Sequence, residues 1–530
     1  MKISIYIEYS MAQGHAWWSS TPLRCGYTRA IQISKVACRM IRKPSVDWLQ
    51  ITVDRRQDAP ISRQIFQQIR SAILNGRLRD GDRLPSSRIL AEHLRVSRTT
   101  LLNSYDLLYE EGLIEARRGS GTTVSAVMTD SLHIDDAAPQ ISQPKYATPL
   151  PPEYKHSSGV PYDFRPGTPA WDLFPRELWA RTISRVVRHL DASHVGYGPA
   201  EGAWSLRKAL ARHLRLERGM VMDANEIIIT SGATQAIDLL SRIAIRPGGV
   251  VVIEDPSHPV LRETFRRAGA FIVPVPVDEN GCQIEKIEAE LIRYGKTGDE
   301  VQLIYLTPTC QFPVGSSLSM ERRVSVLKWA RDRDVLVIDD DYDGELNRNN
   351  DSAPMLHELD SRSTAHIGTF SKTMYPGLRL GYAVLPDVVR NRFIEVKWQN
   401  DRLTQIIEQY ALAEFMESGR YRHHVQTMGR AYARRRRHLA ANLRLCFGDR
   451  VSVRGAKAGL HLLASIKTRY AARSVARRAL SKGVRVYPAE NFYYECAPPE
   501  PATFLLGYAS MTAGEMKAGL DRLATAAGIR

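Results

Sequence analysis

Isoleucines recur at helical spacing close to the start of the chain. In the segment 60–78 they share one face of a predicted helix, which ends at Asn75-Gly76 because that pair favours a helix stop. The apolar face consists of Ile61, Ile65, Ile69, Ile73 and Leu74. Two more helices are expected, one starting at Pro85-Ser86 and one capped by Ser97, with a tight turn between them. The pattern predicts a helix-turn-helix.

The start of the last of these helices keeps a polar outward face. Its inward residues are Leu101, Tyr105 and Leu108, and those of the preceding helix are Ile89, Leu90 and Leu94. The outward residues are Ser97, Arg98, Thr99 and Thr100. The stretch 112–124 then alternates like a hairpin with Gly119-Ser120-Gly121 at its tip, which predicts a wing after the helices.

From Asp163 onward the pattern changes to alternating strands and helices. Short runs rich in β-branched residues are separated by amphipathic helical stretches, and they occupy 226–230, 250–255, 301–308, 335–341 and 364–370. Strands that alternate with helices at this spacing predict a mostly parallel, doubly wound sheet. After about Pro386, long Arg-rich helical stretches precede a smaller α+β segment, roughly 451–530.

Composition divides the chain into four regions. Residues 1–47 show no sustained period, so we expect a weakly structured extension, with a translation start near Met40 as a further hypothesis. Residues 48–125 form the compact helical segment, and residues 126–162, rich in Pro, Ser and Asp, predict a linker. Residues 163–530 carry the strand–helix alternation. A multidomain protein is predicted: a winged helix-turn-helix, then an α/β domain with a smaller α+β C-terminal part.

Composition and charge narrow the possible partners. The 530 residues are 44% hydrophobic and 25% charged, as in globular rather than disordered proteins. A net charge of +16 and a pI near 9.6 favour nucleic acid or an anionic membrane as partner, or else a solvated basic surface. No apolar run reaches the roughly 18 residues of a membrane span. Six cysteines without a CxxC pair favour a reduced, cytoplasmic compartment and no metal site.

The polar helix start suits DNA. Helix amides and hydroxyls hold phosphates, and an arginine such as Arg98 can bind guanine through two hydrogen bonds. The wing would bring Arg117 and Arg118 to the DNA backbone or minor groove. The alternative is that Arg88 and Arg98 only form surface ion pairs.

This segment resembles the GntR-type winged helix. The resemblance rests on the phrases G-R-L-x-x-G-D-R-L-P-S-S-R, V-S-R-T-T and E-E-G-L-I-x-x-R-R-G-S-G-T, which cover nearly all of it. It implies contacts with a double-stranded DNA operator from Arg88, Ser97, Arg98, Thr99, Thr100 and the wing around Gly119. One departure is Leu102, where some relatives have an arginine.

One lysine in the second half has unusual neighbours. Lys372 follows a strand-like run in HIGTFSKTMYPGLRLGYAVLP (366–386), close to Thr369, Ser371 and Arg379. A lone lysine in a loop is nearly always a solvated charge. Here the hydroxyls and the arginine can bind a phosphate dianion, and a lysine with a lowered pKa can form an imine with an aldehyde.

Three other segments complete a predicted pocket. VIDDDYDGEL places carboxylates at the carboxyl end of a strand, where one can keep a pyridine nitrogen protonated while Tyr342 donates to a phenolic oxygen. In TSGATQAIDLL (230–240) a glycine turn starts a helix whose amides can bind an anion. LTPTCQFPVG (306–315) is a loop after another strand.

Together these segments resemble the fold-type I aminotransferases, and specifically the MocR-type regulators, in which such a domain follows a GntR-type winged helix. Phrases such as F-R-P-G-x-P, Y-G-P-A-E-G, D-D-Y-D-G-E and G-T-F-S-K-x-x-x-P-G-L-R-L-G-Y carry the resemblance over roughly residues 48–530. It implies pyridoxal 5'-phosphate bound through Lys372, with Asp340 at the pyridine nitrogen and Tyr342 at the phenolic oxygen. The flanking Asp339 and Asp341 leave the choice of aspartate open.

The resemblance also implies a phosphate site and a dimer. The implied phosphate contacts come from Gly232, Ala233, Thr234, Thr369, Ser371 and Arg379. Tyr197 matches a family tyrosine that reaches the cofactor phosphate of the other subunit, which implies a homodimer.

Three residues depart from the family pattern. His258 stands where relatives often have a tyrosine near the cofactor ring, and Cys310 stands where a histidine is common. Leu505 aligns with an arginine that holds a substrate carboxylate in amino-acid-handling relatives. Arg485 is a candidate replacement, although a surface position is the simpler interpretation. The cofactor half of the site is therefore expected to be intact and the substrate half altered.

The favoured interpretation is a pyridoxal-phosphate-dependent transcription regulator in the cytoplasm. It would sense a small amine, an amino-acid-like compound or the cofactor itself, and Leu505 makes an ordinary α-amino acid the less favoured effector. The alternative is an aminotransferase with an appended helical domain, and a third interpretation is an inert dimerisation scaffold. We expect no turnover enzyme, and at most partial transamination chemistry.

Overall fold

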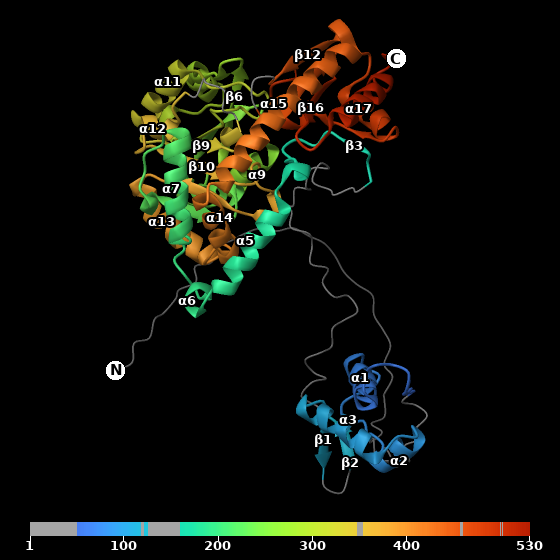
Figure 1. Cartoon of the computed structure of the whole chain (residues 1–530). Coiled ribbons are helices and arrows are strands. Elements are labelled where there is room, and N and C mark those ends of the chain that lie inside the picture. The colour runs from blue at the N-terminus through green and yellow to red at the C-terminus, as the bar shows by residue number, and fades with distance from the viewer. Residues whose placement is uncertain are drawn as a thin grey trace, which may run out of the picture. The chain divides into compact units, whose positions relative to one another are not determined.

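The computed structural model describes residues 50–117, 121–125, 159–346, 353–455, 459–498, 500 and 502–529. The chain divides into two compact units, Met1–Pro149 and Leu150–Arg530 (Figure 1). The predicted extension 1–47 and most of the predicted linker 126–162 lie outside the described residues. The boundaries of these regions therefore stay predictions.

The described residues of the first unit form three helices and a two-stranded hairpin. The elements are α1 (Ile61–Leu74), α2 (Ser87–His93), α3 (Arg98–Glu110), β1 (Ile114–Arg117) and β2 (Gly121–Val124). The hairpin is antiparallel and pairs Ile114 with Val124. The predicted inward residues of α1 and α3, among them Ile65, Ile69 and Leu101, share one buried apolar cluster. The winged helix-turn-helix is confirmed.

Serine caps fix where α2 and α3 begin. The side chain of Ser86 accepts from the Ile89 amide at 3.4 Å, and that of Ser97 accepts from the Thr100 amide at 3.0 Å. The prediction that Ile89 faces inward is wrong, because this side chain is 48% exposed. The seven-residue helix α2 buries Leu90 and Ala91 instead.

An eight-stranded sheet lies at the centre of the second unit. Its order is β4-β11-β10-β9-β8-β5-β6-β7. The strands are β4 (Ile227–Thr230), β5 (Val250–Asp255), β6 (Phe271–Asp278), β7 (Gly281–Cys282), β8 (Val301–Leu306), β9 (Leu336–Asp341), β10 (Thr364–Thr369) and β11 (Gly381–Val384). The neighbours from β10 through β9, β8 and β5 to β6 are parallel, whereas β11 is antiparallel to both β10 and β4. The mostly parallel sheet is confirmed.

Helices cover both faces of this sheet, so that its strands are buried on two sides. One face packs against α8 (Ala233–Ala244), α9 (Pro259–Arg267) and α13 (Asp387–Asn400). The opposite face packs against α10 (Ile287–Arg293), α11 (Met320–Arg331) and α12 (Leu356–Leu359). Near β4, a larger cluster contains α5 (Arg176–His189), α7 (Trp204–Arg218) and α14 (Ile406–Glu417), and the short α6 (Ala192–Val195) follows α5.

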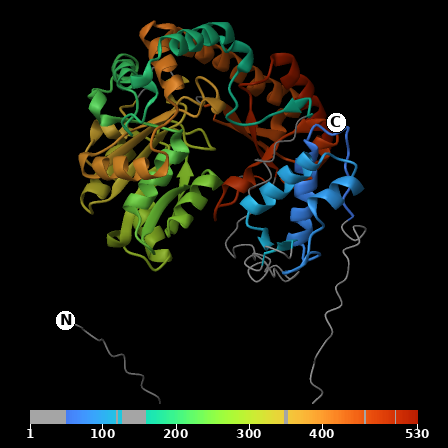
Figure 2. The same ribbon diagram turned by 90° about the horizontal axis from the view of Figure 1, so that it is seen from below.

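The long helix α15 (Arg420–Phe447) runs from the sheet to a smaller C-terminal part, which Figure 2 shows in red. This part has a four-stranded sheet of order β12-β13-β16-β15. Its elements are β12 (Val451–Arg454), β13 (His461–Ile466), α16 (Ala472–Leu480), β15 (Tyr487–Pro488), β16 (Thr503–Gly507) and α17 (Ala513–Ala526). The strand β14 (Val484–Arg485) pairs with β3 (Tyr162–Asp163), so the beginning of the second unit joins its C-terminal part.

The predicted fold class is thereby confirmed: a winged helix, then an α/β unit with a smaller α+β C-terminal part. In the part of the chain that the structure describes, no helix combines the length and apolar character needed to cross a membrane.

Candidate functional site

Lys372 lies in the loop that follows β10, at the carboxyl end of the parallel strands. Its Nζ donates a hydrogen bond of 3.0 Å to the carbonyl oxygen of Gly167. Burial lowers the pKa of this amine, and the charges of Asp343 and Asp340 oppose that shift. The lowered pKa increases the neutral fraction of Lys372, the form that attacks a carbonyl.

The three adjacent aspartates of β9 have different neighbours. Asp339 lies 3.3 Å from the ring of His366, and Asp341 forms an ion pair of 3.0 Å with Arg218. Asp340 instead accepts a hydrogen bond of 2.6 Å from the Tyr305 hydroxyl. Burial, with the charges of its two neighbours, raises the pKa of Asp340 to about 7, and the bond from Tyr305 opposes the shift.

Strand parity separates Asp340 from the other two. Successive residues of a strand point to opposite faces, so Asp340 shares the face of Ile338, and Thr369 on β10 shares that of Ile367. Ile338 and Ile367 pack in the cluster that contains α8. Asp340 and Thr369 therefore lie on the α8 side of the sheet, which favours Asp340 over Asp339 and Asp341 as the residue that acts with the α8 anion site.

Four of the predicted phosphate residues, Gly232, Ala233, Thr234 and Arg379, lie at the amino end of α8. Gly232, the N-cap residue, has φ +95°, a conformation that favours glycine. The Arg379 guanidinium donates to the Ser231 carbonyl at 2.7 Å and would lie 3.1 Å from a Cβ at Gly232. The Thr369 hydroxyl donates to Ser371 at 3.1 Å. Ala233 and Thr234 open the helix, so its first amides and the Arg379 guanidinium can bind one anion, while the hydroxyls of Thr369 and Ser371 stay predicted contacts.

The residues present fit pyridoxal phosphate. The buried Oδ1 of Asp340 has no hydrogen-bond partner among the described residues. Buried polar atoms are normally paired, so this oxygen suits a partner on a bound ring. The pyridine nitrogen supplies such a partner, and the Lys372 amine and the α8 anion site suit the aldehyde and the phosphate. The Tyr342 hydroxyl interacts with the Cys310 thiol and stays the predicted donor to the phenolic oxygen.

Two further predicted residues occupy different environments. His258 caps α9 and lies 5.2 Å from the ring of Phe312. Burial, with a contribution from the charge of Lys372, lowers its pKa to about 4, so the ring is neutral near pH 7. Tyr197 is 83% exposed and has the guanidinium of Arg402 over its ring at 5.8 Å.

The residues that depart from the family pattern lie between the sheet and the C-terminal part. Cys310 is 1% exposed, and its thiol would lie 3.2 Å from a Cβ at Gly459. Leu505 is fully buried in an apolar cluster with Val314 and Phe492. The surface interpretation of Arg485 is wrong, because its side chain is only 17% exposed and lies 3.9 Å from Asp163.

Gly167, which the sequence analysis did not single out, has an added Cβ position only 2.8 Å from the Lys372 amine. We expect Gly167→Ala to weaken pyridoxal phosphate binding by roughly tenfold or more, because overpacking displaces the lysine. Gly248→Ala is the matched control, since Gly248 also has positive φ but nothing within 4 Å of its Cβ position. Titration of each variant with the cofactor, followed by visible absorbance, measures the effect. Equal affinities of the two variants would contradict the steric contact.

The candidate DNA surface is the start of α3. Arg88, Ser97, Arg98 and Thr99 are exposed, and Thr100 is half-buried. Among residues 50–117 and 121–125, no acidic side chain forms an ion pair with Arg88 or Arg98. Arg117 ends β1, and only its backbone is described. Arg118 and Gly119 lie outside the described residues.

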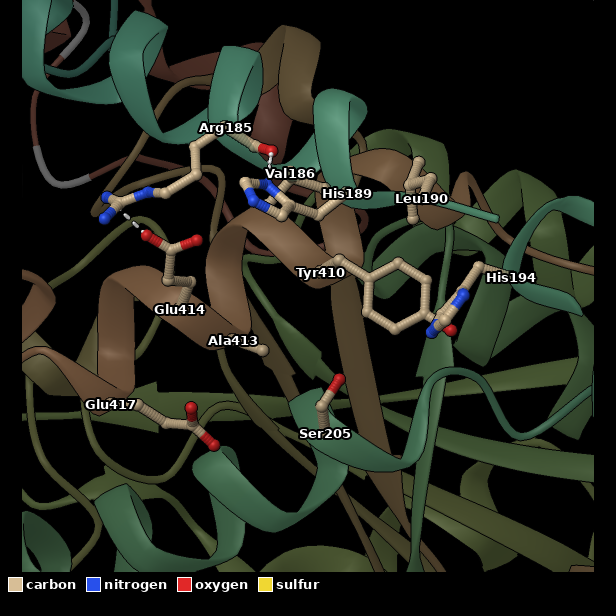
Figure 3. Close-up of a pocket in the computed structure, with 10 residues that line it drawn as sticks. All are labelled: Arg185, Val186, His189, Leu190, His194, Ser205, Tyr410, Ala413, Glu414 and Glu417. Atoms are coloured by element: carbon tan, nitrogen blue, oxygen red, sulfur yellow. Dashed lines mark hydrogen bonds and ion pairs between the residues drawn. The ribbon is translucent and has the colours of Figure 1, made fainter. Parts of the chain in front are cut away.

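A separate surface hollow lies between α5, α6, α7 and α14 (Figure 3). Arg185 forms an ion pair of 2.5 Å with Glu414 there, and Tyr410 contacts the ring of His194 at 5.3 Å. None of the predicted site residues lines this hollow. Its charged groups are partly satisfied by each other, so it offers no specific chemistry.

Two family models match the chain. Residues 61–124 match bacterial regulatory proteins of the gntR family, and residues 175–523 match aminotransferase class I and II. The probable rhizopine catabolism regulatory protein MocR of Rhizobium meliloti is 30% identical over 485 residues, which cover 90% of this chain and 95% of that protein. The chain belongs to the MocR-type regulators.

Other relatives of this MocR-type chain are also named as regulators. The HTH-type pyridoxine biosynthesis transcriptional regulator PdxR of Corynebacterium glutamicum is 31% identical, over 73% of this chain and 80% of that protein. The HTH-type transcriptional regulator TauR of Rhodobacter capsulatus is 28% identical, over 88% of this chain and 96% of that protein. Transcription regulation, rather than the aminotransferase alternative, is thus the function of this chain.

Solved aminotransferase structures resemble the second unit of this MocR-type regulator. Kynurenine aminotransferase of Pyrococcus horikoshii, in complex with PMP, has a TM-score of 0.64 and 25% identity, over 70% of this chain and 91% of that chain. LysN, an α-aminoadipate aminotransferase of Thermus thermophilus complexed with N-(5'-phosphopyridoxyl)-L-leucine, has a TM-score of 0.63 and 26% identity. The match covers 69% of this chain and 92% of that chain. The fold of the second unit is that of the aminotransferases.

Proposed function

We propose that this MocR-type regulator holds pyridoxal 5'-phosphate through Lys372, and that a small amino compound acting at the cofactor changes how the protein binds its DNA operator. The observation that carries the proposal is the cluster of Lys372 and Asp340 with the anion site at the amino end of α8. Burying so many polar groups is costly unless they bind something. An inert scaffold has no use for them.

Each side chain of the cluster has one role in this proposal. Lys372 binds the cofactor covalently, the free Oδ1 of Asp340 keeps the pyridine nitrogen protonated, and Tyr342 donates to the phenolic oxygen. The phosphate is held by Gly232, Ala233, Thr234, Thr369, Ser371 and Arg379. When bound, the cofactor supplies an aldehyde carbon that reacts reversibly with amines. The neutral ring of His258 packs beside it without adding charge.

The proposed assembly is a homodimer that carries two DNA readers. The large exposed ring of Tyr197 is available to contact the cofactor phosphate of a second copy. A dimer suits a two-fold symmetric operator, since each winged helix reads one half-site. An effector changes DNA affinity only as far as it binds the two states of the dimer with different affinity.

A DNA-binding titration of the full chain tests this function. Duplexes selected from a random pool would be bound at fixed salt by protein loaded with pyridoxal phosphate, and the cofactor and a panel of amines would then be varied. We expect the affinity for the selected duplex to change with the cofactor or with at least one amine. An affinity that responds to neither would contradict sensing, and multiple-turnover transamination would favour the enzyme alternative.

A further inference from the structure

We propose that Arg165 binds the carboxylate of the effector, which is therefore an amino acid and not a simple amine. The inference deepens the proposed function and rests on it, because it needs the amino group of the same compound to act at Lys372. Arg165 lies far from both Lys372 and Leu505 in the sequence, and the fold brings the three elements together.

The backbone beside Arg165 reaches the reactive lysine. Gly167, two residues along, accepts the 3.0 Å hydrogen bond from the Lys372 amine. Two residues of chain span at most about 7 Å. The carbonyl of Phe164, the residue before, accepts from the Gly507 amide of β16 at 2.8 Å. Arg165 thus stands between the lysine loop and the strand that carries Leu505.

The Arg165 side chain points to the face of β16 that holds Leu505. Its Nε donates to the Tyr487 hydroxyl at 3.1 Å. Tyr487 is directly opposite Leu505 in the antiparallel pair β15–β16, so their side chains share one face, and both belong to the same buried cluster. The guanidinium of Arg165 therefore lies on the side of the sheet where Leu505 replaces the carboxylate-binding arginine of amino-acid-handling relatives.

The ion pair of Arg165 is long. Asp163 lies 3.4 Å from Arg165 and 3.9 Å from Arg485, whereas a direct charge-assisted N–H···O bond measures about 2.7–2.9 Å. Tyr487 does not supply a second negative charge, because burial and the nearby Asp163 raise its pKa to about 12. The Tyr487 hydroxyl instead donates to Asp163 at 2.9 Å and so orients that carboxylate.

This cluster is only partly shielded from solvent. The side chains of Arg165 and Asp163 are 29% and 26% exposed, and that of Arg485 is 17% exposed. A ligand carboxylate can reach such a guanidinium and form charge-assisted hydrogen bonds with it, because the site is open to solvent only in part. Arginine suits the task because its planar fork matches a carboxylate.

Paired probes test the proposal on the full chain loaded with pyridoxal phosphate. The probes are β-alanine and 4-aminobutanoate, each compared with the amine that lacks its carboxylate, ethylamine and propylamine. Apparent affinities come from the change in the visible spectrum of the cofactor. We expect the wild type to prefer at least one amino acid over its matched amine, and Arg165→Gln to reduce that preference by roughly tenfold or more.

The variants separate this proposal from the cofactor claim. Arg165→Gln should keep the cofactor spectrum and the affinity for the simple amines, and Arg165→Lys should restore only part of the preference because it lacks the planar fork. Arg392→Gln is the matched control, since Arg392 is 62% exposed on α13 and is likewise paired with a carboxylate, Glu395. A wild type without preference, or an Arg165→Gln variant that keeps it, overturns the proposal and leaves the cofactor claim intact. A wild type without a cofactor spectrum overturns both.

Discussion

Lys372→Arg is expected to remove nearly all of the visible absorbance that covalently held pyridoxal phosphate gives the purified protein. Arginine keeps the positive charge and the approximate length of the side chain, but it has no primary amine and stays protonated in proteins. The half-buried lysine has a lowered pKa and is close enough to Asp340 for the charge of that carboxylate to act on it. Borohydride reduction followed by intact mass measurement should add the cofactor to the wild type and not to this variant.

Lys397→Arg is the matched control for that experiment. Lys397 is fully buried, whereas Lys372 is half-buried, and burial lowers the pKa of both amines, with the hydrogen bond from the Lys397 ammonium to Asp401 opposing the shift. Lys397 forms an ion pair of 2.9 Å with Asp401, which also accepts a hydrogen bond of 2.8 Å from Gln235 in the first turn of α8. Arginine keeps the positive charge of this ion pair. We therefore expect Lys397→Arg to bind the cofactor as the wild type does. Reduction that labels the Lys372→Arg variant to the wild-type level would disprove the assignment of Lys372.

The lysine loop could be predicted from the sequence because its chemistry is local. Thr369, Ser371, Lys372 and Arg379 fall within eleven residues that begin at the end of one strand, and the hydrophobic pattern alone predicts a strand followed by a loop. The choice of Asp340 from three adjacent aspartates needed the three-dimensional structure. Only the neighbours, His366, Arg218 and Tyr305, and the position of α8 distinguish the three carboxylates.

Contacts between distant segments were not predictable. Gly167 and Lys372 are 205 residues apart, and Arg165 and Tyr487 are 322 apart, so no local pattern links them. The surface interpretation of Arg485 failed for the same reason, since its partner Asp163 belongs to the first strand of the unit. The prediction that Ile89 faces inward was wrong for a different reason: in a helix of only seven residues the apolar positions do not define a face well enough.

Arg98→Ala is expected to weaken binding to the specific duplex by roughly five- to a hundredfold at fixed salt, because a bidentate base contact contributes about 1–3 kcal/mol. Two hydroxyls in the middle of α3 fix the helix to the rest of the unit: that of Tyr105 donates to the Pro85 carbonyl, and that of Ser104 donates to the Ser62 carbonyl, each at 2.8 Å. Its amino end therefore presents Arg98, exposed and without an ion-pair partner among residues 50–117 and 121–125. Fluorescence anisotropy with specific and scrambled duplexes measures both affinities.

Arg70→Ala provides the control for charge in the same unit. Arg70 lies on α1 and forms an ion pair of 2.7 Å with Glu111, just after the far end of α3. Both variants remove one positive charge, so they should lose similar amounts of the salt-dependent affinity for scrambled DNA. Only Arg98→Ala should lose the difference between specific and scrambled duplexes, since base contacts specify and phosphate contacts position. If Arg98→Ala weakens binding to both duplexes equally, Arg98 contacts phosphate, and another residue at the start of α3 contacts the bases.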